Sequence, residues 1–104
     1  MKYVYSTVDP GPPKYTLEEF GRDLEKEIDK GYDPIRIGTW AWNMVITRDL
    51  EKNKGYDLWD IGVTLEAFGS TQEMYRTEED LRYFAKCFQE GKYEGVLDTI
   101  IKHE

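Results

Sequence analysis

The apolar residues of this chain recur mainly at intervals of three and four, which is the period of an amphipathic helix. The first such stretch begins with TLEE, which has the form of a capping box between Thr16 and Glu19. Gly31 stands where a helix would end. We therefore predict a helix over about residues 16–30. Its apolar stripe consists of Leu17, Phe20, Leu24 and Ile28.

The densest apolar block, IRIGTWAWNMVI at residues 35–46, has two interpretations. As a strand it would place Trp40 and Trp42 on one face, as a recognition surface requires. As a helix it would point the two indoles about 200° apart, with core packing as their main role. Asp33 and Pro34 occupy the positions of an N-cap and a first-turn proline, so a helix is favoured. The helical stripe would be Ile37, Trp40, Ala41, Met44 and Val45.

Three more apolar stripes follow a polar loop at residues 48–56. Asp57 is a suitable cap for the first of them, and Gly62 within it leaves room for another backbone. Thr77 opens TEED, a capping box with aspartate at its last position, before the second stripe. The third continues to the C-terminus. The predicted helices span about residues 57–69, 77–91 and 93–101.

The fold class indicated by these stripes is mainly α, a bundle-like single domain of four to five helices covering residues 1–104. Residues 3–8, YVYSTV, have the composition of a short strand, and the prolines of residues 9–13 would end it. Residues 70–76 are also extended in character. These two segments could pair into a small β element beside the helices.

The charge balance narrows the possible partners. Lys and Arg number 14 against 21 Asp and Glu, a net charge of −7, which disfavours nucleic-acid binding. No apolar run approaches the length of a membrane span, and none resembles a signal peptide. The single cysteine, Cys87, excludes an internal disulfide. We therefore expect a cytoplasmic protein that binds neither a membrane nor nucleic acid.

Residues able to carry out chemistry are sparse. The one histidine, His103, is next to the C-terminus, and Cys87 has no histidine positioned to activate it. No spacing typical of a metal site or a phosphate loop is present, so no metal or cofactor is expected. With 21 acidic residues, some carboxylates will lie close together by chance, for example Asp57 with Asp60 or Glu66 with Glu73. Such pairs are therefore weak evidence for catalysis. We predict that the protein is not an enzyme.

The first predicted helix is strongly acidic. Glu18, Glu25 and Asp29 lie off its apolar stripe, and Asp33 follows at the start of the next helix. Carboxylates on an exposed face can attract a basic partner over a long range. We expect these four residues to contact a basic protein, with Trp42 as a candidate aromatic anchor.

In size, acidity and helicity the chain resembles the small bacterial immunity proteins of the colicin-type nuclease inhibitors. The segments that carry the resemblance are TLEEF at 16–20, IGTWAW at 37–42 and TEEDLRYF at 77–84. It implies a helical domain that blocks a basic toxin. The YVYSTV segment and the proline turn depart from it, and it assigns no individual binding residue.

Two other functions stay open from the sequence. One is an enzyme or a small-ligand protein with a pocket near Trp40 and Asp60. The other is a structural domain that associates with copies of itself.

Overall fold

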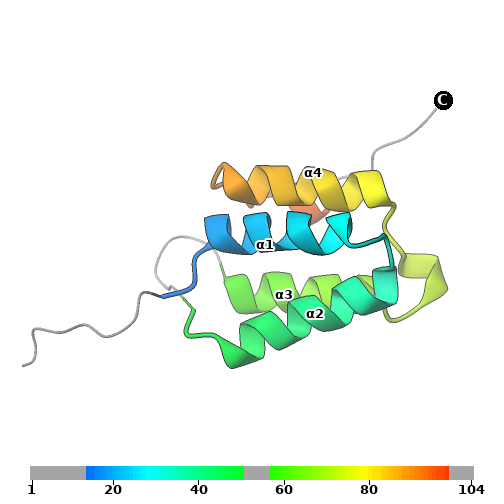
Figure 1. The fold of residues 1–104 in the computed structure, drawn as a ribbon, viewed down its shortest axis with the longest axis horizontal. Helices are drawn as coiled ribbons and strands as arrows, with labels where there is room; N and C mark the ends of the chain where they lie inside the picture. The colour runs from blue at the N-terminus through cyan, green and yellow to red at the C-terminus, as the bar shows by residue number, and fades with distance from the viewer. Residues whose placement is uncertain (1–13, 51–56, 99–104) are drawn as a thin grey trace, which may run out of the picture.

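The computed structural model describes residues 14–50 and 57–98, and in them the chain is mainly helical, as predicted (Figure 1). The α-helices are α1 (Leu17–Asp29), α2 (Pro34–Thr47), α3 (Leu58–Phe68) and α4 (Glu78–Gln89). Two single turns of 3₁₀ helix, η2 (Gln72–Met74) and η3 (Val96–Asp98), precede and follow α4. None of the helices in this part of the chain has both the length and the apolar character needed to cross a membrane.

The helices pack as two close pairs, α1 with α4 and α2 with α3. In Figure 1, α1 lies between α4 and the α2/α3 pair, so that its apolar stripe is covered on both sides. The core residues form one cluster across all four helices. Its largest fully buried side chains are Phe20, Phe84, Phe88, Leu17, Leu24, Ile28, Ile37 and Leu58.

The starts predicted for the first four helices are confirmed, because each rests on a local hydrogen bond. Thr16 and Glu19 form a reciprocal capping box at α1, and Thr77 and Asp80 form the equivalent box at α4. Asp33 caps α2, so the block at residues 35–46 is a helix and not a strand. These side chains satisfy backbone NH groups that have no partner within the helix.

The predicted β element, a pairing of residues 3–8 with residues 70–76, is wrong for residues 70–76. Residues 72–74 form η2, with Met74 N donating to Thr71 O and Tyr75 N to Gln72 O. This local turn satisfies backbone groups that a lone extended segment would leave unpaired. Within the described residues there is no strand, only an isolated parallel bridge between Tyr15 and Leu50. The predicted strand at 3–8 and the proline turn at 9–13 lie outside those residues.

The predicted last helix, residues 93–101, is also wrong for residues 93–98, the part of it that the structure describes. After α4 the backbone has positive φ at Gly91 (79°) and Gly95 (70°), a conformation that interrupts a helix. Only η3 follows Gly95 in the described part, although Val96 still reaches the core. Residues 99–101 and His103 lie outside the description.

Glycines allow the close contact between α2 and α3. A Cβ at Gly62 would lie 2.5 Å from a methyl of Val45 and 3.1 Å from Ala41 O, in agreement with the predicted close approach. Gly69 ends α3 next to α2, where a Cβ would lie 2.3 Å from Pro34 O. The two helices can therefore run side by side without a layer of large side chains between them.

Candidate functional site

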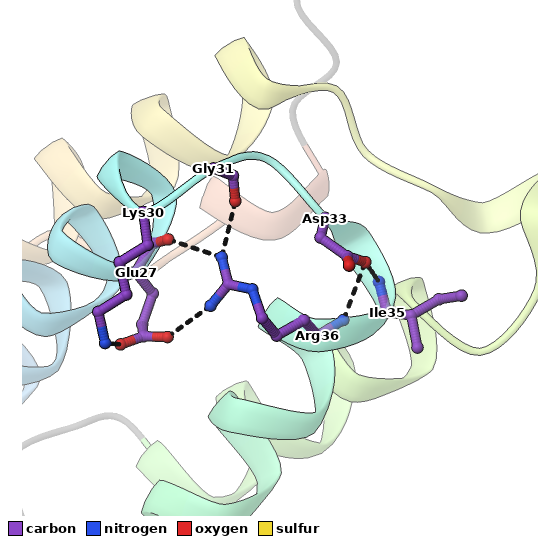
Figure 2. Close-up of polar contacts among 6 residues, drawn as sticks. All are labelled: Glu27, Lys30, Gly31, Asp33, Ile35 and Arg36. Carbon is purple, nitrogen blue, oxygen red and sulfur yellow. Dashed lines mark hydrogen bonds and ion pairs between the residues drawn. The ribbon is translucent and has the colours of Figure 1, made fainter.

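The turn between α1 and α2 is held by one arginine. Arg36 donates through Nη1 to Glu27 Oε1 at 2.7 Å, and through Nη2 to two backbone carbonyls, Glu27 O at 2.9 Å and Gly31 O at 2.7 Å (Figure 2). The other oxygen of Glu27 pairs with Lys30 Nζ at 2.6 Å. The guanidinium thus ties the end of α1 to the start of α2 by its planar fork of donors.

The start of α2 is fixed by its cap. Asp33 Oδ1 accepts from the backbone NH groups of Ile35 and Arg36, both at 3.1 Å (Figure 2). Pro34 occupies the first helical position, where its missing NH costs nothing. The carboxylate of Asp33 therefore has a set position at the surface, and it also favours the helix N-terminus electrostatically.

Tyr32 lies in the same turn and is partly exposed. Its hydroxyl donates to the backbone carbonyl of Arg76, next to the start of α4, while 39% of the residue surface remains accessible. Partial burial and nearby negative charges, that of Asp80 first among them, raise the pKa of the Tyr32 hydroxyl above its ordinary value. Tyr32 therefore stays protonated and connects the α1–α2 turn to the segment before α4.

Carboxylates lie near this tyrosine, because the charges of Asp80, Asp33 and Glu78 all act on its hydroxyl. Asp29 and Glu78 share one guanidinium, with Arg82 Nη1 at 2.9 Å from Asp29 and Arg82 Nε at 3.0 Å from Glu78. Asp33 is the third exposed carboxylate of the group. We call Asp29, Tyr32, Asp33 and Glu78 the acidic corner.

The structure brings together two of the four predicted partner-binding carboxylates. Asp29 and Asp33 are both in the acidic corner, whereas Glu18 and Glu25 lie further back along α1. Glu25 accepts from Gln89 Nε2 of α4 at 2.9 Å. The carboxylate of Glu18 is half-buried beside Gly91, where a Cβ would approach it to 3.2 Å. Glu25 therefore takes part in the α1–α4 contact, as Asp29 also does through Arg82, and Glu18 lies beside the turn that follows α4.

The candidate anchor Trp42 is half-buried on α2 and is not one of the residues of the acidic corner. Its ring meets that of Trp59 edge to face, with centroids 5.0 Å apart. Trp40 points toward α1 instead and stacks on Phe20, with centroids 5.3 Å apart. The helix thus separates the two indoles, and Trp59 (43% exposed) is the more accessible of the pair it forms with Trp42.

Tyr32, Glu78 and Trp59 were not predicted as surface-site residues. Tyr32 follows Gly31 in a turn, and no local pattern shows that its hydroxyl reaches a backbone carbonyl 44 residues later. For Trp59, one signal was present in the sequence. On a helix starting at residue 58 it falls outside the stripe of Leu58, Ile61 and Leu65, which marks it as an exposed indole.

The arrangement offers little for catalysis among the described residues. Cys87 is buried in α4, and Asp57 serves as the cap of α3. The described residues hold no group of three His, Cys, Asp or Glu side chains placed for a metal ion. Three hollows lined by described residues lie near Arg76 and near Gly91, and Trp40 and Asp60 are not among the residues that line these three.

Replacing Arg36 by lysine tests how the turn is held. An ammonium group keeps the charge but cannot reach Glu27 and two carbonyls in one plane. We expect the variant to lose about 1–2 kcal/mol of unfolding free energy, measured by urea denaturation. Lys26→Arg, an exposed exchange on α1, should leave stability unchanged. An Arg36→Lys variant as stable as the wild type would show that the fork contributes nothing.

Comparison with known protein families, with curated proteins and with solved structures finds no match for this chain.

Proposed function

We propose that this chain is a non-enzymatic protein-binding domain that binds a basic partner through the acidic corner. The observation that carries the proposal is Tyr32, an aromatic side chain held by its hydroxyl and partly exposed near the carboxylates of Asp33 and Glu78. Glu78 shares the guanidinium of Arg82 with Asp29. Tyrosine is enriched among the residues that carry most of the binding energy at protein interfaces.

The rigidity of the corner supports this function. The fork of Arg36 and the cap of Asp33 fix the turn before any partner arrives, so little side-chain freedom would be lost on binding. The net charge of −7 adds long-range attraction for a basic surface. Such attraction raises the association rate and weakens as salt is added.

The type of partner that fits best is a basic protein whose activity is blocked when it is covered. This extends the resemblance to immunity proteins of nuclease toxins, which are small, acidic and helical. On this proposal the chain works as an inhibitor by occlusion and needs no catalytic group. Its partner would be cationic around an apolar or aromatic pocket that accepts Tyr32.

The test is capture of partners by the tagged full chain from its native cells at physiological salt. We expect a basic protein to bind the wild type and to be lost from the double variant Asp29→Lys, Glu78→Lys. The matched control is Glu94→Lys with Asp98→Lys, which makes the same charge change beyond the other end of α4. Circular dichroism checks that every variant stays helical.

Two results would contradict the proposal. One is that the captured protein binds the corner variant and the control variant equally well. The other is that binding does not weaken between about 50 mM and about 300 mM salt, since screening must reduce an interaction steered by charge.

A further inference from the structure

An uncharged stripe runs along the exposed side of α2 and begins at Ile35, whose backbone NH donates to Asp33 of the acidic corner. It consists of Ile35 (57% exposed), Thr39, Trp42 and Ile46 (44% exposed). Their spacing of four, three and four residues places them on one narrow face of the helix. Exposed isoleucines at this spacing are unusual on a surface that contacts only water.

The absence of charge is specific to this part of the molecule. The only charged side chain of α2 is Arg36, which turns toward Glu27 and Gly31 of the α1–α2 turn. The neighbouring row on α3 adds Trp59 and half-buried Val63, and its one charge is Glu66 at the far end. In a chain of which 34% of residues are charged, a row of four uncharged residues along α2, bordered on α3 by Trp59, Val63 and the single carboxylate of Glu66, indicates an apolar contact.

We propose that this face is the contact between two copies of the chain, with α2 packed antiparallel against α2 of the second copy. A symmetric contact requires a surface that is complementary to itself. The stripe meets this requirement because the intervals between its residues, four, three and four, are the same whichever end of α2 is counted from. In an antiparallel pair Ile35 opposes Ile46 of the second copy, and small Thr39 opposes large Trp42.

Charge also favours a second copy over a basic partner at this face. Two chains of net charge −7 repel one another, so they can approach closely only where neither carries a carboxylate. A basic protein would gain nothing from a stripe without acids. The proposal is independent of the acidic corner, because the stripe and the corner use different side chains.

The size of the face sets the strength to expect. Fourteen residues of α2 extend about 21 Å, and the face is two helices wide. A contact limited to a face of this length is at the small end of specific interfaces. We therefore expect a dissociation constant on the order of micromolar or weaker.

Analytical ultracentrifugation of the full chain tests the proposal. Between about 1 µM and about 1 mM the mass should rise from that of the 12.3 kDa monomer toward twice that value. Trp59→Glu and Ile46→Glu should each weaken the dimer at least tenfold. Tyr83→Glu is the matched control, because it puts the same charge at a similarly exposed aromatic of α4 and should not change the constant.

A cross-linking experiment tests the antiparallel register. Ile35→Cys mixed with Ile46→Cys should give a covalent dimer with a short thiol-specific reagent, whereas each variant alone should give little more than the wild type, whose Cys87 is buried. A chain that stays monomeric at about 1 mM, a dimer unaffected by both glutamate variants, or efficient cross-linking of a single variant would overturn the proposal.

Discussion

Replacing Phe20 by alanine is expected to remove most of the stability of this fold, with a loss of about 3–5 kcal/mol of unfolding free energy. The ring is fully buried in the first turn of α1 and lies close to three other aromatic rings. It stacks on Trp40 at 5.3 Å, meets Tyr15 at 6.4 Å and lies 6.0 Å from Phe88. Its removal leaves a cavity that these rigid neighbours cannot fill.

Urea denaturation followed by tryptophan fluorescence measures this loss, because the three tryptophans, among them Trp40 on the Phe20 ring, change their surroundings on unfolding. A domain of about this size has roughly 5–15 kcal/mol in total, so partial unfolding at room temperature is an expected outcome. Ile35→Ala is the control, because Ile35 is 57% exposed and its truncation should cost within about 0.5 kcal/mol. If both variants unfold at the same urea concentration, Phe20 does not hold the core together.

The helices could be predicted from the sequence because their ends depend on residues close in the chain. Thr16 with Glu19 and Thr77 with Asp80 form their capping boxes over three residues, and Asp33 caps α2 over two and three. Such signals are complete within a few residues. The predictions of extended structure at 70–76 and of an α-helix over residues 93–98, the described part of the last one, failed because short segments without a cap depend on their surroundings.

The acidic corner could be predicted only in part. The helical stripe showed that Asp29 and Glu25 face outward, which is correct. It could not show that Asp29 pairs with Arg82, 53 residues later, or that Glu25 meets Gln89, 64 residues later. Which acids remain available to a partner depends on which helix packs beside α1, and that pairing has no local signal.

The α1–α4 pairing depends on Gly21, and replacing this residue by alanine gives the second large prediction. A Cβ here would lie 2.8 Å from each of three atoms of α4: Ala85 O, Gln89 N and Phe88 Cβ. Two of them are backbone atoms, so no side-chain rotation relieves the clash. In an isolated helix, replacing glycine by alanine would be favourable by about 1 kcal/mol. A loss of stability in the folded protein would therefore be due to the clash with α4.

We expect Gly21→Ala to lower the unfolding free energy by about 1–3 kcal/mol, because α1 and α4 must separate along their whole contact. Thermal and urea denaturation measure it. Gly38→Ala is a graded control in α2, where the nearest atom to a Cβ, Leu65 O, lies at 3.0 Å and needs a smaller shift. A stabilised Gly21→Ala variant would mean that α1 and α4 are further apart than described. A loss at Gly21 clearly larger than at Gly38 would show that the α1–α4 crossing is the tightest contact tested.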